Sequence, residues 1–363
     1  MIPYGRQSIS EEDIAAVAEV LRGDWLTQGP TVERFEQTVI EATGARHAVA
    51  YSSGTAALHG ATAAAGLGPG DLVATSPLSF MASANCARYV GADVALIDID
   101  RATLNLDPAG VLPEHDALVA VHYAGLPVDL TALAIRPRVV IEDAAHALGA
   151  FTPDGPVGNC AHSDMCCFSF HPVKPVTTAE GGVVTTNSDE YANALRRFRS
   201  HGIVRKPELG EWYYEIDSLG FNYRLTDIQA ALGASQMLRL DDFIERRNAI
   251  ADRYRSELAD LNCVLPPAAP AGTRHGYHLF AIQVEDRATV FHTLREREIG
   301  VQVHYVPIHH HPISRDARLP ESGLAECDGV YDRIISLPMH PSLSEDDQST
   351  VIATLRDVLG TKA

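Results

Sequence analysis

The chain has 363 residues, of which 46% are hydrophobic and 21% are charged, and its formal charge is −18 at pH 7. A chain of this length and composition can bury a substantial core in two domains, and its negative charge argues against a nucleic-acid backbone or an anionic membrane surface as the main partner. The sequence predicts no signal peptide and has no apolar run of the roughly 18 residues that a membrane span needs.

Strands alternate with helices over about the first 240 residues. The sequence predicts helices at 9–21, 32–43 and 55–65, and Ser10 and Asp13 form a variant of the capping box at the start of the first helix. Short apolar runs predict buried strands at 48–51, 72–74, 94–97, 118–121 and 139–141. This alternation is typical of an α/β protein whose mixed, mostly parallel sheet is covered by helices on both faces.

The C-terminal part of the chain differs in composition and begins near the proline-rich segment 265–270. The elements predicted around and after this segment are a long helix at 228–257, a strand at 278–284, a helix at 288–298 and a strand at 301–305. We therefore expect a large domain over residues 1–245 and a smaller α+β domain over residues 246–363.

One lysine lies in a loop between two prolines. Lys174 stands directly before Pro175 and two residues after Pro172, and the loop follows the apolar run at 168–170. Pro175 disfavours helical geometry at Lys174, so the amine is held on a stiff loop and not on a solvated helix face. A lysine presented in this way can form a Schiff base with pyridoxal phosphate. A single lysine beside a turn is nevertheless more often an ordinary surface residue.

A phosphate-binding turn is predicted where a strand passes directly into a helix. The strand at 48–51 ends, Ser53 and Gly54 make the turn, and the helix begins at Thr55. The free N–H groups and the positive dipole end of such a helix bind phosphate, and Thr55 adds a hydroxyl. Because an ordinary helix cap has the same pattern, the segment is informative only together with others.

Residues at two further strand ends are candidates for contact with a cofactor ring. Asp143 follows the strand at 139–141, at the sheet edge where α/β proteins bind ligands. A carboxylate there keeps a pyridinium nitrogen protonated, and His146 lies one turn further along the chain. Phe80 follows the strand at 72–74 and is placed to stack on the ring. The alternatives are a helix N-terminal acid for Asp143 and a core aromatic residue for Phe80.

The cysteines and histidines give no sign of a metal centre. The six cysteines lack the paired spacing of a zinc site, and we expect them to be reduced, as in a cytoplasmic protein. His309, His310 and His311 are consecutive, so their side chains should point in different directions and seldom converge on one ion. The sequence therefore predicts no metal site.

The phosphate-binding turn, the aromatic residue, the strand-end aspartate and the lysine loop form a set that is more specific than any of its members. Over nearly the whole chain the sequence resembles the fold-type-I pyridoxal-phosphate enzymes, and among them the sugar aminotransferases of the DegT/DnrJ/EryC1/StrS family. The segments that carry the resemblance are 53–56, 142–146, 168–174, 180–182 and 220–224.

The resemblance implies a role for each of several residues. Lys174 would bind the cofactor covalently and then move the proton between the substrate carbon and the cofactor. Thr55 and Ser169, with the Ala56 amide beside Gly54, would hold the phosphate. Asn222 would contact the same phosphate from the neighbouring subunit, which implies a homodimer with shared sites. No chemistry is assigned to Arg224.

Segments near the N-terminus resemble the pseudaminic-acid branch of the family. These segments are 2–7 and 24–30, and 304–307 fits the same branch. The resemblance implies that glutamate donates an amino group to C4 of a nucleotide-linked 4-keto-6-deoxy sugar. The residues that would line the nucleotide-sugar pocket are Tyr4, Leu26, Thr27, Gln28, Gly29, His304, Tyr305, Val306 and Pro307.

Three alternatives remain open from the sequence. The substrate of an aminotransferase could carry its keto group at C3 or be linked to dTDP. A deoxysugar dehydratase on the same scaffold is disfavoured, because the related dehydratases replace the lysine with histidine, whereas Lys174 is present here. A non-catalytic binding or regulatory protein is disfavoured because the lysine, aspartate, serine and asparagine are all retained.

Overall fold

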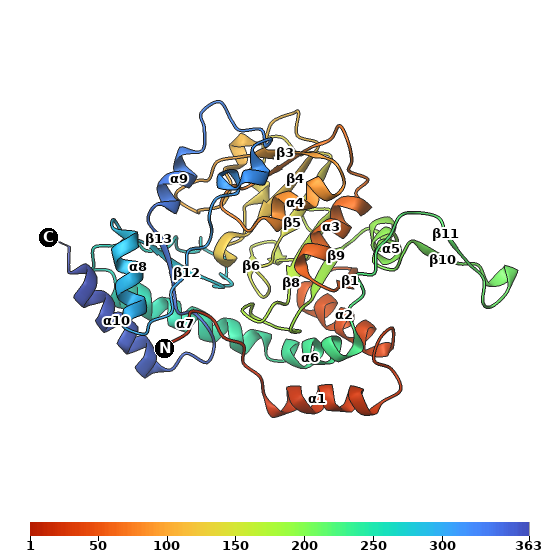
Figure 1. Ribbon diagram of the computed structural model, residues 1–363, viewed down its shortest axis with the longest axis horizontal. Coiled ribbons are helices and arrows are strands. Elements are labelled where there is room, and N and C mark those ends of the chain that lie inside the picture. Colours follow the sequence, from red (N-terminus) through yellow and green to blue (C-terminus); the bar gives the residue numbers. More distant parts are fainter. Residues whose placement is uncertain (363) are drawn as a thin grey trace.

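A seven-stranded sheet forms the centre of the computed structural model, which describes residues 1–362 (Figure 1). Its strands are β1 (His47–Tyr51), β2 (Leu72–Thr75), β3 (Asp93–Leu96), β4 (Ala117–Val121), β5 (Val139–Asp143), β8 (Met165–Ser169) and β9 (Gly182–Thr186). They lie in the order β1-β9-β8-β5-β4-β2-β3. β9 is antiparallel to both of its neighbours, and the other strands run in one direction. The mixed, mostly parallel sheet predicted from the sequence is confirmed.

Helices cover both faces of this sheet. The helices of this part of the chain are α1 (Glu11–Arg22), α2 (Pro30–Thr43), α3 (Gly54–Ala64), α4 (Ala82–Tyr89), α5 (Asp189–Phe198), α6 (Asp227–Met237) and α7 (Leu240–Glu257). α3, α4 and α5 pack on one face, and α2, α6 and the start of α7 pack on the other. Side chains alternate between the two cores along each strand: Val49 of β1 joins the first core, and Ala48 and Ala50 join the second.

α1 lies outside the second layer and packs on α6 (Figure 1). The predicted capping box is confirmed, because the Ser10 and Asp13 side chains each accept a hydrogen bond from the other residue's backbone amide. Asp13 is fully buried and also accepts hydrogen bonds from Ser235 and Gln236 of α6. This buried carboxylate therefore fixes the first helix to the body of the protein.

The C-terminal part forms its own core around a two-stranded antiparallel sheet. Its elements are β12 (Phe280–Gln283), α8 (Arg287–Glu296), α9 (Ala325–Tyr331), β13 (Ile334–Leu337) and α10 (Glu345–Leu359). α7 contributes to two cores, since Ile244 packs with the large sheet and Ile250 and Tyr254 pack with the C-terminal elements. The boundary proposed at 245/246 thus falls inside α7, and the segment carrying Ile308 and Cys327 packs back on the large core. The division into two domains stays a prediction.

Two predicted elements differ from the structure. The first is the single helix predicted at 228–257. The chain instead forms α6 and α7, and Arg239 between them leaves helical geometry (φ −112°, ψ 11°). The Arg239 guanidinium turns toward α1, where it donates a hydrogen bond to Asp13 Oδ2 at 2.5 Å. A tertiary contact therefore breaks a run that is helical by its local propensity.

The predicted strand at 301–305 is also wrong. Only Gln302 pairs with a strand, through an isolated bridge to Ser336. The carbonyl of His304 accepts a hydrogen bond from the Tyr123 hydroxyl at 2.5 Å. This bond ties the segment to η2 (Tyr123–Gly125), and the chain runs past the small sheet without continuing its ladder.

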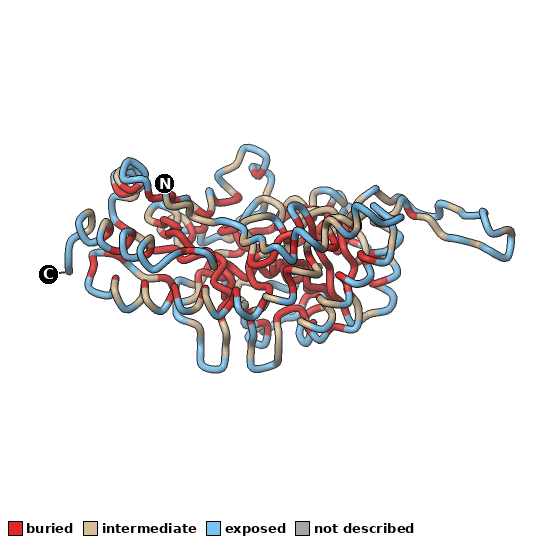
Figure 2. The backbone as a smooth tube through the Cα atoms, turned by 90° about the horizontal axis from the view of Figure 1, so that it is seen from below, coloured by how far each residue is buried: buried red, intermediate tan, exposed pale blue. Residues whose placement is uncertain are grey.

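A hairpin arm that the sequence analysis does not anticipate projects from the body of the protein. It is formed by β10 (Ile203–Arg205) and β11 (Tyr214–Ile216), and it extends far to one side in Figures 1 and 2. Large apolar side chains are exposed along it, and Trp212 at its tip is 82% exposed. Monomeric proteins rarely expose apolar side chains in such a group.

The remaining elements are short. They are the strands β6 (Phe151–Thr152) and β7 (Gly155–Pro156) and the 3₁₀ helices η1 (Pro108–Gly110), η2 (Tyr123–Gly125), η3 (Leu130–Ala132), η4 (Pro207–Leu209), η5 (Ile308–His310) and η6 (Pro312–Ser314). Across residues 1–362, every helix is too short or too polar to cross a membrane.

Candidate active site

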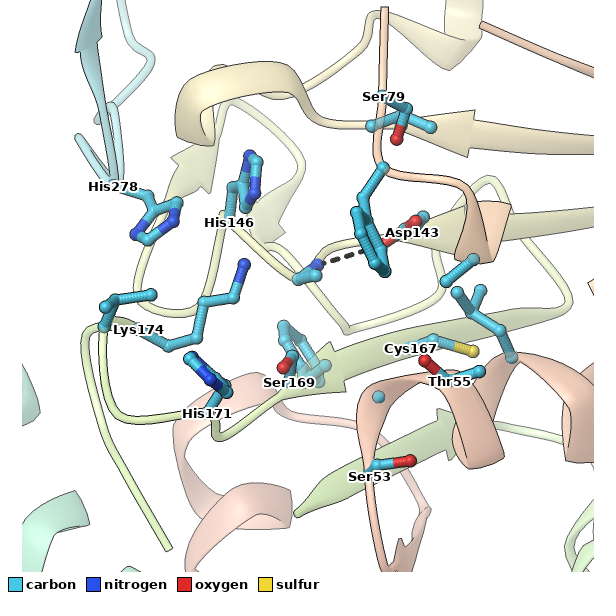
Figure 3. Close-up of a pocket in the computed structure, with 18 of the residues that line it drawn as sticks. Ser53, Thr55, Ser79, Asp143, His146, Cys167, Ser169, His171, Lys174 and His278 are labelled. Carbon is cyan, nitrogen blue, oxygen red and sulfur yellow. Dashed lines mark hydrogen bonds between the residues drawn. The ribbon is translucent and has the colours of Figure 1, made fainter. Parts of the chain in front are cut away.

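A cavity of about 400 Å³ opens at the edge of the sheet where β5 and β8 end, beside the start of α3 (Figure 3). This is the edge at which open α/β sheets bind ligands. The residues predicted from the sequence that line the cavity are Tyr4, Gly54, Thr55, Phe80, Asp143, His146, Ser169, Lys174, His304 and Tyr305. The fold thus gathers segments that are up to about 300 residues apart in the chain.

Lys174 extends into this cavity toward His146 from the loop after β8 (Figure 3). The loop is fixed by its own backbone: Lys174 N–H donates to the His171 carbonyl at 2.9 Å, and Thr178 N–H donates to the Phe170 carbonyl at 2.9 Å. Burial lowers the pKa of the Lys174 amine to about 8, although the Asp143 carboxylate acts in the opposite direction. An amine with such a pKa is partly neutral at physiological pH and is therefore a nucleophile.

The carboxylate of Asp143, the last residue of β5, accepts hydrogen bonds that fix its position. Its Oδ2 accepts a hydrogen bond from Ser83 Oγ at 2.6 Å, and its Oδ1 accepts one from the Ala145 amide at 3.2 Å. Ser83 is in turn hydrogen-bonded to Ser79, with 2.7 Å between the two hydroxyl oxygens. The carboxylate is therefore fixed in one orientation beside the cavity.

Sequence reasoning did not identify Ser79 and Ser83. The sequence feature that could have indicated these two residues is their spacing of four just after the end of β2. This spacing places both hydroxyls on one side of a helical turn. That spacing is too common in proteins to mark a site without the position of Asp143.

The hydroxyl-rich end of the cavity is built by close contact between α3 and two strands. A Cβ atom at Gly54 would lie 2.9 Å from the Ser169 Cβ, and one at Gly182 would lie 2.2 Å from the Ser53 carbonyl oxygen. Glycine at these positions therefore allows the start of α3 to rest directly on β8 and β9. The Thr55 and Ser169 side chains line the cavity there, next to the positive end of the helix dipole.

The Ala56 amide, which the resemblance assigns to the phosphate, makes a helix-cap contact in this structure. The amide donates to Ser53 Oγ at 3.1 Å, and the residue does not line the cavity. Gly54 and Thr55 are the first residues of α3, and amides in a first helical turn have no intrahelical acceptor.

On the opposite side, aromatic and imidazole side chains form the wall and the mouth of the cavity. His146 Nε2 is 3.0 Å from the Tyr305 hydroxyl, and the two rings are stacked with an interplanar angle of 22°. Phe80 lies at the mouth with 60% of its surface exposed, and its ring centroid is 6.1 Å from that of Tyr305. Tyr4 reaches the same wall because its carbonyl accepts a hydrogen bond from the Met339 amide at 2.9 Å.

The histidines of this wall are uncharged at neutral pH. Burial lowers the pKa of His304 to about 4 and holds the pKa of His146 and of His278 well below the usual value. His278 lines the cavity beside His146, with ring centroids 4.4 Å apart. The sequence contained no signal for His278, because it lies in an unremarkable segment just before β12.

The other predicted site residues do not line this cavity. Val306 and Pro307 come directly after the wall residues His304 and Tyr305 in the chain but do not line the cavity. Asn222 is exposed at the base of the hairpin arm, where it forms a bridge with Ser200. The segment from Leu26 to Gly29 lies against the start of α6: Thr27 forms a bridge with Thr226, and Gly29 N–H donates to Asp227 Oδ2 at 2.8 Å. Asn222 and this segment are therefore close to each other and outside the cavity of their own chain.

The residues that do line the cavity fit pyridoxal phosphate. The cofactor needs an amine for its carbonyl carbon, a carboxylate for its ring nitrogen, and hydrogen-bond donors for its phosphate. Lys174, Asp143 and the group formed by Thr55, Ser169 and the start of α3 provide these in one cavity. The low pKa of the amine agrees with a lysine that reacts with a carbonyl carbon.

Comparison with known proteins identifies the family. Residues 7–356 match the model of the DegT/DnrJ/EryC1/StrS aminotransferase family. The spore coat polysaccharide biosynthesis protein SpsC of Bacillus subtilis is 38% identical over 99% of this chain and 97% of its own length.

Two solved structures cover 99% of this chain and 99% of their own. The PMP form of the sugar aminotransferase Spr1654 from Streptococcus pneumoniae has a TM-score of 0.92 at 27% identity. PseC of Helicobacter pylori, an aminotransferase involved in the biosynthesis of pseudaminic acid, has a TM-score of 0.90 at 28% identity. Spr1654 has also been solved in a PLP form. The chain belongs to the DegT/DnrJ/EryC1/StrS aminotransferase family, has the fold of the fold-type-I enzymes, and is a pyridoxal-phosphate-dependent sugar aminotransferase.

Proposed function

We propose that this enzyme transfers the amino group of glutamate to C4 of a nucleotide-linked 4-keto-6-deoxy sugar. The substrate we propose is UDP-2-acetamido-2,6-dideoxy-β-L-arabino-hex-4-ulose, used in the biosynthesis of pseudaminic acid or a related surface glycan. The names of two relatives support a glycan pathway, since SpsC is a spore coat polysaccharide protein and PseC acts in pseudaminic-acid biosynthesis.

One observation carries the proposal: Tyr4, His304 and Tyr305, which the family resemblance assigns to a sugar pocket, line the same cavity as Lys174. Within residues 1–362, the lining contains one lysine and no arginine. A wall of aromatic rings and uncharged imidazoles suits a neutral sugar ring, because rings pack against its C–H groups and the nitrogen and hydroxyl groups bind its hydroxyls.

In the proposed transamination, each of several cavity residues has its own role. When bound, pyridoxal phosphate would supply a carbon that bonds to an amine and a ring that withdraws electrons from the carbon attached to that amine. Lys174 Nζ binds the cofactor and, when a substrate amine replaces it, takes up and returns a proton at the substrate carbon. Asp143 holds the proton on the ring nitrogen, and Ser83 fixes the orientation of its carboxylate. Thr55 and Ser169 hold the phosphate end.

The pKa of Lys174 predicts how cofactor attachment depends on pH. Only the neutral amine can attack the cofactor, and the pKa of Lys174 is about 8 in the free protein. Below this pH the protonated amine dominates, so the attachment rate should rise about tenfold per pH unit and level off above pH 8. Stopped-flow absorbance after mixing apoprotein with cofactor measures this rate. A rate that still rises steeply above pH 9 would indicate an ordinary lysine.

We also propose a homodimer in which each cavity is completed by the other subunit. Asn222 and the Leu26–Gly29 segment are among the predicted site residues that do not line their own cavity, and both lie near the start of α6, where Thr27 forms a bridge with Thr226. The exposed apolar side chains of the arm beside them support burial of this region in an interface.

Subunit complementation tests this arrangement. Lys174→Ala removes the amine, and Asn222→Asp places a negative charge where the proposal puts the phosphate, so each homodimer should be inactive. A heterodimer would contain one intact site, and a refolded equal mixture should recover about a quarter of wild-type activity. The same proteins mixed without subunit exchange are the control. If Asn222 acts within its own chain, no heterodimer has an intact site and no activity returns.

The cysteines support a cytoplasmic location, which we include in the proposal. All six are buried and unpaired in the described residues, as in proteins from reducing compartments.

The substrate is tested by incubating the enzyme with glutamate and a panel of UDP- and dTDP-linked 3-keto and 4-keto sugars. Mass spectrometry and NMR of the products should show a 4-amino sugar from the UDP-linked 4-keto substrate and 2-oxoglutarate from glutamate. Amination at C3, or turnover of the dTDP sugars alone, would contradict the proposed substrate. Loss of a hydroxyl group from the sugar without amination would indicate a dehydratase.

A further inference from the structure

Two of three consecutive histidines face the same carboxylate on the surface of the protein. His309 and His310 belong to η5, and Asp328 belongs to α9. The Nε2 atom of each histidine is 2.9 Å from Asp328 Oδ1, and the three donor atoms all lie within 4.8 Å of one another. None of these residues lines the catalytic cavity.

Both elements that carry these donors are anchored to the body of the protein. On the η5 side, Ile308 is fully buried and its amide donates to the Pro77 carbonyl at 2.9 Å. On the α9 side, the amides of Glu326 and Cys327 donate to the Asp98 carboxylate at 3.0 and 2.9 Å. The donors are therefore held in position before any ligand arrives, which lowers the entropy lost on binding.

We propose that His309, His310 and Asp328 form a binding site for a divalent transition-metal ion such as Zn²⁺. The ligands would be the two Nε2 atoms and a carboxylate oxygen, with water in the remaining position. Two imidazoles and one carboxylate are a ligand set that zinc accepts. A tetrahedral ion with bonds of about 2.0–2.1 Å holds neighbouring donors about 3.3 Å apart, so each pair that is now 2.9 Å apart needs to separate only slightly.

The solvent exposure of the site and the net charge of the protein both favour binding of a cation. The side chains of His310 and Asp328 are 37% and 45% exposed, which leaves an entry path, whereas that of His309 is 12% exposed and forms the base of the site. The formal charge of −18 also raises the local concentration of cations.

Metal binding here would clamp η5 to α9. The segment directly before η5 contains His304 and Tyr305, which line the catalytic cavity. A bound ion would therefore stabilise the cavity wall without touching substrate or cofactor. The competing arrangement is purely hydrogen-bonded, with both imidazole N–H groups donating to the shared carboxylate oxygen.

Zinc titration of the chelator-treated holoenzyme separates these arrangements. Isothermal calorimetry should show one site per chain that is weakened at least ~10-fold in His310→Asn and in Asp328→Asn, each of which removes one ligand. His311→Asn is the matched control, because this neighbouring histidine is outside the cluster, and it should bind zinc like the wild type. Melting temperatures without metal check that each variant is folded.

Zinc should raise the melting temperature of the wild type and of His311→Asn, and it should have little effect on the other two variants. The proposal is overturned if His310→Asn and Asp328→Asn bind zinc as tightly as the wild type, since the ion would then be held elsewhere, for example by the cavity histidines.

Discussion

Replacing Lys174 with alanine should reduce transamination at least ~10⁴-fold, because no other residue of the cavity offers an amine to the cofactor. Borohydride reduction followed by peptide mass spectrometry gives a second readout that does not depend on activity. In the wild type the cofactor should be fixed to the peptide that contains Lys174, and in Lys174→Ala it should be fixed to no residue.

Lys174→Arg is the matched control for charge and size. The guanidinium keeps a positive charge near Asp143 but stays protonated, so it cannot attack a carbonyl carbon. We expect it to be as inactive as Lys174→Ala while the protein keeps its melting temperature. Activity above one tenth of the wild-type value in either variant would show that another group binds the cofactor.

Asp143→Asn should lower kcat by ~10²–10³-fold, the usual effect of losing one aligned electrostatic contact in an active site. Asparagine has the shape of aspartate and can keep the hydrogen bonds to Ser83 and Ala145, so the cavity should remain folded. It has no negative charge with which to hold the proton on the ring nitrogen. The pH titration of the bound cofactor's absorbance should shift accordingly, and a kcat within threefold of the wild type would exclude this role.

Ser83→Ala should produce a smaller effect of the same kind. It removes the 2.6 Å hydrogen bond to Asp143 but leaves the charge, so we expect kcat to fall ~10-fold, in line with the loss of one bond to a charged group. Ser76→Ala is the control, because Ser76 is equally buried and its hydroxyl accepts from the Leu78 amide, away from Asp143. Ser83→Thr should restore most of the activity.

The His309–His311 run has a side-chain arrangement that spacing alone does not indicate. Consecutive side chains leave the backbone in different directions, and the sequence therefore predicts that they do not share an ion. In the structure His309 and His310 both turn toward Asp328, which lies between them on another element. The partner 18 residues further along the chain decides the geometry, and nothing local to the histidines indicates it.

Local sequence patterns were sufficient to predict those features of the structure that depend only on residues close together in the chain. The capping box at Ser10, the apolar runs of the parallel strands and the glycine turn at Gly54 each express short-range rules, and the structure contains all three. The break at Arg239 and the loss of a strand at 301–305 occur where the chain makes long-range bonds to Asp13 and Tyr123. A local pattern contains no information about these partners.

The sequence by itself determined the class of the sheet, five of its strands and the family, because strand patterns and family motifs act over a few residues; the antiparallel strand β9 was not among the predicted strands. Only the tertiary structure decided what surrounds the Lys174 amine. Folding places Ser83 behind Asp143 and His278 beside His146, and it leaves Asn222 outside its own cavity. Burial, pKa and hydrogen-bond geometry depend on atoms from many segments at once, so they become fixed only when those segments pack together.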